Sequence, residues 1–194
     1  MLMSSLLLSL ANAYYYTPKK LDAYVGIGYG ATAFNANYNR VDLYNSSISK
    51  NGYANDMGYK LYAGLQATDT FGVEVSYNSY GKFTNLTYIQ EPKSITLSAT
   101  FSESYYNQQF RPFINVEIGY MHTKQNLNFY FKHAFVLHYG LGIDYFHKAL
   151  NGLGLRIALE GDNSVESDNY YDVYSYTKSF RNYVNYHIGV IYKF

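Results

Sequence analysis

The chain has 194 residues, with 15 Lys and Arg against 14 Asp and Glu and a formal net charge of +1. This balance argues against a nucleic-acid-binding surface, which needs excess basic side chains to displace counterions from phosphates. No cysteine is present, so disulfides and thiolate zinc sites are excluded. One residue in five is aromatic, with 26 Tyr and 12 Phe, and the length fits a single folded domain.

The N-terminus has features of a secretion signal. A short apolar run, residues 6–10, is followed by Ala11-Asn12-Ala13, a small-residue pattern that signal peptidases accept. The segment is short and has no basic residue before the apolar run, which indicates a signal that is either truncated at its start or weak. We therefore predict a signal peptide over 1–13 and one domain over 14–194. No later apolar run reaches the roughly 18 residues needed for a membrane-spanning helix.

Beyond the signal, hydrophobicity alternates with the period of two that is typical of β-strands. In each run one set of alternate residues is apolar or aromatic, and the other set is mostly Gly, Ser, Thr and Asn with a few charges. The runs number about eight and cover 23–31, 59–67, 71–77, 95–101, 114–120, 135–145, 153–159 and 184–194. Eight is the smallest strand number of closed outer-membrane barrels.

The connections between these runs alternate in length. Residues 68–70, 103–111 and 148–152 are short turns, the last containing Asn151-Gly152, a strong hairpin signal. The connections at 32–56, 79–92, 121–132 and 161–182 are long and polar. Long loops at one end and short turns at the other are typical of outer-membrane barrels, whose long loops are extracellular and short turns periplasmic. The sequence therefore predicts an all-β fold, an eight-stranded antiparallel up-and-down transmembrane barrel.

A soluble lipocalin-type barrel would show the same alternation, with its apolar side facing inward. Two features favour the membrane barrel. The polar set has few charges for a water-facing surface, and it fits a packed interior network of Lys60, Glu74, Glu117, Asp144, Arg156 and Glu160, with Lys193 as a further partner of the carboxylates. Aromatic residues also gather at both ends of the apolar set, as in the two girdles of a bilayer-spanning barrel. These are Tyr29, Tyr59, Tyr77, Tyr120 and Phe135 at one end, and Phe71, Phe101, Tyr145, Tyr192 and Phe194 at the other.

The C-terminal segment 186–194 resembles the last strand of bacterial outer-membrane proteins. Segments 24–30 and 111–120 are similar to the first and fifth strands of small barrels of the OmpA/OmpX/Opa type. The resemblance implies an outer-membrane location, contact with membrane lipid and lipopolysaccharide, and a monomer. It also implies recognition by the barrel-assembly machinery through Tyr186, Ile188, Val190, Tyr192 and Phe194.

No residue pattern points to catalysis. The deacylases among small barrels place His and Ser two residues apart on one strand, and the sequence contains no His-x-Ser. It contains no His-x-His or Asp-x-His metal pair along a strand either. His138 and His187 are expected to be interior hydrogen-bonding residues. We therefore predict no catalytic residues, no metal ligands and no cofactor.

Function is then expected to lie in the structure of the barrel and in its long loops. An eight-stranded barrel is just wide enough for its own side chains, so interior charges should fill the lumen. The last long connection is rich in tyrosine, a residue suited to contacts with protein or glycan. Its residues Tyr170, Tyr171, Tyr174 and Tyr176 either make such contacts or pack on one another above the membrane. The sequence predicts a structural protein, or an adhesin-like protein that contacts a host or surface ligand through its long loops. A small channel, a lipid A-modifying enzyme and a soluble binding protein are the alternatives.

Overall fold

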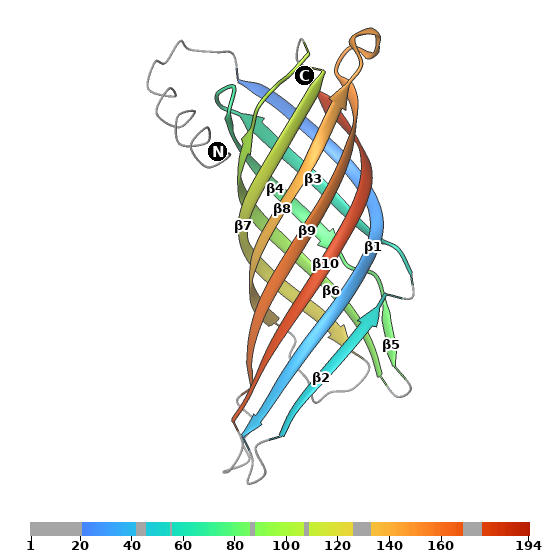
Figure 1. Cartoon of the computed structure of the whole chain (residues 1–194), viewed down its shortest axis with the longest axis vertical. Helices are drawn as coiled ribbons and strands as arrows, with labels where there is room; N and C mark the ends of the chain where they lie inside the picture. Colours follow the sequence, from blue (N-terminus) through green and yellow to red (C-terminus); the bar gives the residue numbers. More distant parts are fainter. Residues whose placement is uncertain are drawn as a thin grey trace.

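The computed structural model describes residues 21–194 except 42–45, 55, 86–87, 107–108, 126–132 and 169–175, so the signal segment 1–13 lies outside the described residues. Eight antiparallel strands close into a barrel, because the last strand pairs with the first over Tyr24↔Lys193 to Val41↔Tyr176 (Figure 1). In ring order they are β1 (Asp22–Val41), β3 (Gly58–Gln66), β4 (Phe71–Ser79), β6 (Tyr88–Ser102), β7 (Phe110–Gln125), β8 (His133–Phe146), β9 (Leu153–Asp168) and β10 (Tyr176–Lys193). This is the predicted fold.

The short connections and the C-terminus lie at one end of the barrel (Figure 1). One of these connections contains η1 (Lys148–Leu150), followed by Asn151 and Gly152, whose φ angles are 43° and 93°. The connection from β8 to β9 spans 147–152, so it is longer than the two-residue hairpin turn that Asn-Gly predicts, but these two residues still supply the positive φ angles at which the chain reverses. No described helix is long and apolar enough to cross a membrane.

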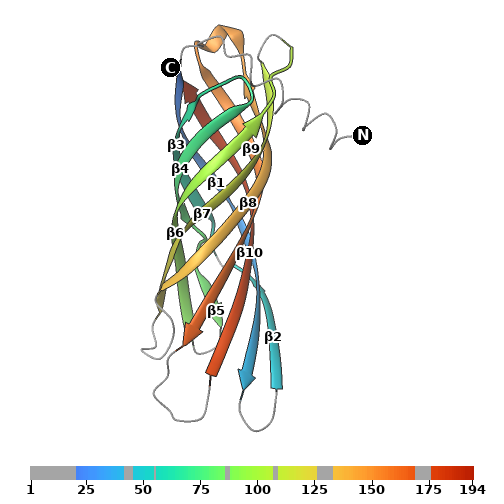
Figure 2. The ribbon, with the colours of Figure 1, turned by 90° about the vertical axis from the view of Figure 1, so that its left-hand side faces the viewer.

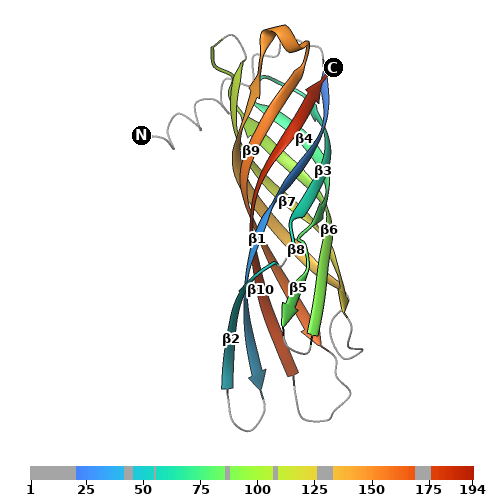
Figure 3. The ribbon, with the colours of Figure 1, turned by 90° about the vertical axis from the view of Figure 1, so that its right-hand side faces the viewer.

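The opposite end differs from the predicted long polar loops. Much of their length is strand, since β1 runs on to Val41, β9 to Asp168, and β10 starts at Tyr176. Two further strands, β2 (Ser46–Tyr53) and β5 (Phe83–Asn85), pair with β1 and β6 there. The strands therefore continue past the cylinder as paired hairpins, as Figures 2 and 3 show from two sides.

The apolar residues face outward and the polar residues face the lumen. In β8 exposed and buried residues alternate strictly from His133 to Asp144. On neighbouring β7 the outward Val116 is 49% exposed, whereas the inward Glu117 is 1% exposed. A lipocalin-type barrel needs the reverse arrangement, so that alternative is wrong. An apolar exterior of this kind is stable only in contact with lipid.

Aromatic rings form contacts at both ends of the apolar exterior, where the girdles were predicted. Tyr59 contacts Tyr29 and Tyr77 at the long-connection end, with ring centroids 6.5 and 6.0 Å apart. At the short-turn end the Phe71 and Phe101 rings are 5.6 Å apart.

Inside the barrel, inward glycines make room for large side chains. A Cβ atom at Gly26 would collide with the Tyr62 ring, and one at Gly64 would collide with the Tyr24 ring. Glycine at these two positions therefore lets two tyrosines cross the lumen.

Candidate functional site

The candidate site is the lumen, because it holds the buried ionisable residues. Toward the short-turn end it centres on Arg156 of β9. The guanidinium donates from Nε to Asp144 Oδ1 (2.7 Å), from Nη2 to Asp144 Oδ2 (3.1 Å), and from Nη1 to Glu74 Oε2 (2.8 Å). Its carbon also lies 4.2 Å from the Tyr62 ring centroid and 4.5 Å from that of Phe113. Glu74 belongs to β4, four strands away around the ring, so this ion pair spans the lumen.

A second ionic group centres on Lys60 of β3. Its Nζ lies 2.7 Å from Glu160 Oε1, 3.3 Å from Glu117 Oε1 and 3.6 Å from Glu74 Oε1. Glu117 also accepts hydrogen bonds from Asn115 Nδ2 (2.6 Å) and from the hydroxyl of Thr96. One ammonium therefore holds together three carboxylates from three different strands.

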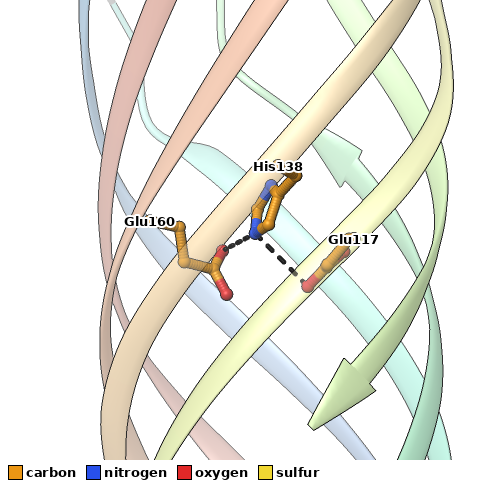
Figure 4. Close-up of side chains that lie close together, drawn as sticks. All are labelled: Glu117, His138 and Glu160. Atoms are coloured by element: carbon orange, nitrogen blue, oxygen red, sulfur yellow. Dashed lines mark ion pairs between the residues drawn. The ribbon is translucent and has the colours of Figure 1, made fainter. Parts of the chain in front are cut away.

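His138 adjoins this group (Figure 4). Its Nε2 is 3.3 Å from Glu117 Oε1 and 3.6 Å from Glu160 Oε2, and its Nδ1 is 2.8 Å from Asp162 Oδ1. Glu117, His138 and Glu160 could offer a metal three ligand atoms within 4.8 Å of one another. Both carboxylates already hold the Lys60 ammonium, however, and a cation between them would lie against that positive charge. The geometry therefore fits an ion-pair cluster better than a metal centre.

Closer to the long-connection end the lumen contains a cluster of buried aromatic and apolar side chains. The Tyr183 ring contacts those of Tyr80, Phe34 and Phe83, with centroids 5.1, 5.6 and 5.9 Å apart. Met121, Ala134 and Val136 complete the buried cluster. The Tyr80 hydroxyl pairs with Ser94 Oγ at 2.7 Å, so this ring keeps a polar partner although it is fully buried. The lumen thus contains an ionic layer and, toward the long-connection end, an aromatic cluster at a level where polar side chains such as Arg181 and Thr123 are buried as well.

The structure brings all six predicted interior residues, Lys60, Glu74, Glu117, Asp144, Arg156 and Glu160, into one connected network. The prediction missed Arg111, Tyr24 and Asp162. Arg111 Nη2 lies 2.6 Å from Asp144 Oδ2, and the Tyr24 hydroxyl donates to Glu74 Oε2 at 3.0 Å. Arg111 was assigned to a turn, although its place in the alternation of β7 is an inward one.

Three further expectations have mixed outcomes. His138 has the hydrogen bond expected of it, to Asp162. Among the described residues, His187 has no hydrogen-bond partner at either ring nitrogen, and its Nδ1 lies 3.5 Å from Glu160 Oε2. Lys193, an expected partner of the interior carboxylates, instead pairs with Asp22 at 2.8 Å.

The remaining predicted residues lie at the two ends of the molecule. Tyr170, Tyr171 and Tyr174 fall outside the described residues, and Tyr176 begins β10 with its side chain undescribed. The predicted assembly residues are in β10 or directly after it, and all five side chains are exposed: Tyr186, Ile188, Val190, Tyr192 and Phe194.

Three solved structures share this architecture. Neisserial surface protein A is 16% identical with a TM-score of 0.56, over 87% of this chain and 97% of that one. OprG from Pseudomonas aeruginosa is 16% identical with a TM-score of 0.55, over 91% and 97%. AlkL, determined in lipid bilayers, is 10% identical with a TM-score of 0.54, over 92% of each chain.

No protein-family model and no curated protein sequence matches the chain. Because these proteins are at most 16% identical to the chain, the structural likeness shows the fold alone. The apolar outer surface of the barrel independently indicates contact with lipid. The chain has the fold of the small bacterial outer-membrane β-barrels, and its lipid-compatible exterior places it in the outer membrane.

Proposed function

We propose that this protein is a non-conducting, non-enzymatic outer-membrane barrel that supports the membrane and presents extended hairpins for contact at the cell surface. The filled lumen is the observation that carries the proposal. Arg156 reaches Glu74 across the barrel, Lys60 joins strands on both sides of it, and the aromatic cluster around Tyr183 lies above them. A steady ion pathway would have to break these buried pairs, each costing about 3–5 kcal/mol when one partner is lost.

The histidines support a non-catalytic role. Within the described part of the chain, neither His138 nor His187 is hydrogen-bonded to a serine hydroxyl, which a hydrolytic relay requires. Both rings face buried carboxylates in the lumen, where a lipid acyl chain has no access. The exposed histidines near the long-connection end, His122 and His133, contact each other and Tyr120, and neither is hydrogen-bonded to a serine among the described residues.

The strand extensions support a surface-contact role. The pairing of β1 with β10 continues from the girdle at Tyr29 to Val41. At a rise of about 3.3 Å per residue and a tilt near 40°, these residues project on the order of 30 Å beyond the girdle. Paired strands hold a surface in place better than free loops do, which lowers the entropy lost on binding a partner.

Planar-bilayer recording of the purified, folded barrel tests the closed lumen. We expect no steady openings from the wild-type protein. The Lys60→Met variant, which lacks the central ammonium, is recorded for comparison. Regular single-channel steps from the wild-type protein would overturn the proposal in favour of a small channel. Mass spectra of lipid A from cells with and without the protein should be identical, and a mass difference would identify an enzyme.

The orientation is tested by epitope insertion on intact cells. A tag placed in the 169–175 connection should bind antibody without permeabilisation, whereas the same tag placed at 107–108 should bind only after permeabilisation. The second insertion is the matched control, because it lies in the same chain at the short-turn end. Labelling of the 107–108 tag alone on intact cells would contradict the surface-contact role.

A further inference from the structure

Two histidines lie side by side on the outer face of the barrel, near the long-connection end. His122 of β7 and His133 of β8 are directly opposite each other in the strand register, and both are exposed. Their Nδ1 atoms are within hydrogen-bond distance of each other, at 3.4 Å, and their ring centroids are 4.9 Å apart. The two residues are eleven positions apart in the sequence and lie on different strands, so spacing along a single strand does not reveal the pair.

The separation of the two nitrogens matches the geometry of a shared metal ion. Imidazole nitrogens bind Zn²⁺ at about 2.0–2.1 Å, and two tetrahedral ligands at that distance are about 3.4 Å apart. The ring of Tyr120 stacks on His133 with a centroid distance of 5.4 Å and an interplanar angle of 22°. This stacking restrains one ligand ring before any metal arrives, which reduces the entropy lost on binding.

We propose that His122 and His133 form a binding site for a divalent transition metal on the outer rim of the barrel. Imidazole nitrogen suits Zn²⁺, Ni²⁺ and Cu²⁺, with Cu²⁺ bound most tightly, whereas Mg²⁺ and Ca²⁺ prefer oxygen ligands. Two protein ligands leave further positions for water. The site faces outward, away from the ionic network of the lumen, and does not depend on the proposed function.

The competing ligand is an anionic headgroup phosphate. Lys93 of β6 is directly opposite His122, so a row of three ionisable side chains crosses β6, β7 and β8. A phosphate would bind the protonated rings, but two imidazolium ions with nitrogens 3.4 Å apart repel each other. Neutral rings sharing a metal avoid that repulsion, and this favours the metal.

The experiment is a titration of the folded, untagged full-length barrel in detergent with Cu²⁺ and Zn²⁺, followed by calorimetry and, for Cu²⁺, by electron paramagnetic resonance. We expect one tight Cu²⁺ site per chain, with two nitrogen ligands in the spectrum. His122→Ala and His133→Ala should each weaken binding by at least about tenfold, since each removes one of two ligands. His147→Ala, at an exposed histidine of the short-turn end, is the matched control and should bind as the wild type does.

The Lys93→Gln variant distinguishes metal binding from phosphate binding. Removing this positive charge should leave metal binding unchanged or tighten it, whereas it should weaken binding of inorganic phosphate or of vesicles containing anionic lipid. Equal Cu²⁺ affinity in the wild type and in both histidine variants would overturn the proposal. So would a Lys93→Gln variant that loses metal binding while its gel mobility still shows a folded barrel.

Discussion

Replacing Arg156 with alanine tests the ionic layer of the lumen. Arg156→Ala removes three charge-assisted hydrogen bonds, two to Asp144 and one to Glu74. The arginine side chain is 1% exposed, so water does not replace these bonds without entering the barrel. Contacts with the Tyr62 and Phe113 rings are lost as well.

The size of the effect depends on which partners each carboxylate keeps in the variant. Breaking a buried ion pair costs about 3–5 kcal/mol, mainly because a charge is left without a partner. Asp144 keeps Arg111 at 2.6 Å, while Glu74 keeps only Lys60 at 3.6 Å and the Tyr24 hydroxyl at 3.0 Å. We therefore expect the free energy of unfolding to fall by about 3 to 4 kcal/mol, with Glu74 as the main cause.

Urea unfolding of the barrel in lipid vesicles measures this change, and the gel mobility of unheated samples confirms folding. Lys148→Ala, in the exposed turn at η1, is the control and should change stability by at most about 0.5 kcal/mol. The double variant Glu74→Gln with Arg156→Met should regain part of the loss, because it leaves fewer unpaired charges. An Arg156→Ala barrel as stable as the wild type would refute the reasoning.

Three other substitutions test other parts of the barrel. Gly26→Val should lower stability by about 1–3 kcal/mol, because its side chain collides with the Tyr62 ring; thermal unfolding measures the loss, and an unchanged midpoint would contradict the close approach. Val116→Lys should cost about 2–4 kcal/mol in vesicles, as a charge on the lipid face does, whereas Val116→Leu should cost almost nothing. Lys60→Met should destabilise the barrel to a similar degree, since it leaves Glu74, Glu117 and Glu160 facing one another; equal urea midpoints would show that the ammonium is not needed.

The sequence predicted the strands well where one face meets lipid and the other meets the lumen. There the two faces lie in different environments, and the alternation of apolar and polar residues reflects that difference directly. The same logic found the six interior charges, because a charged residue in the part of a strand that spans the membrane must point inward. In the connections 32–56 and 161–182 both sets of alternate residues are largely polar, so no apolar alternation marks a strand there. The extensions of β1, β9 and β10 therefore looked like loops.

The sequence did not predict which residues contact each other across the barrel. Alternation predicts that Arg156 and Glu74 both point inward, but only the ring order shows that they meet. The pairing of His122 with His133 likewise depends on the register between β7 and β8. Register is set by the whole sheet and not by either strand alone.

The ion pairs that span the lumen also affect how the barrel is completed. Lys60 on β3 meets Glu160 on β9 only after β10 has paired with β1, the contact with the largest separation along the chain. An open sheet would keep the pairs between neighbouring strands, such as Arg156 with Asp144, but would lose those that cross the lumen, a costly state. Closing the ring therefore completes the neutralisation of the charges. The same coupling opposes lateral opening, since parting β1 from β10 would expose the charges again.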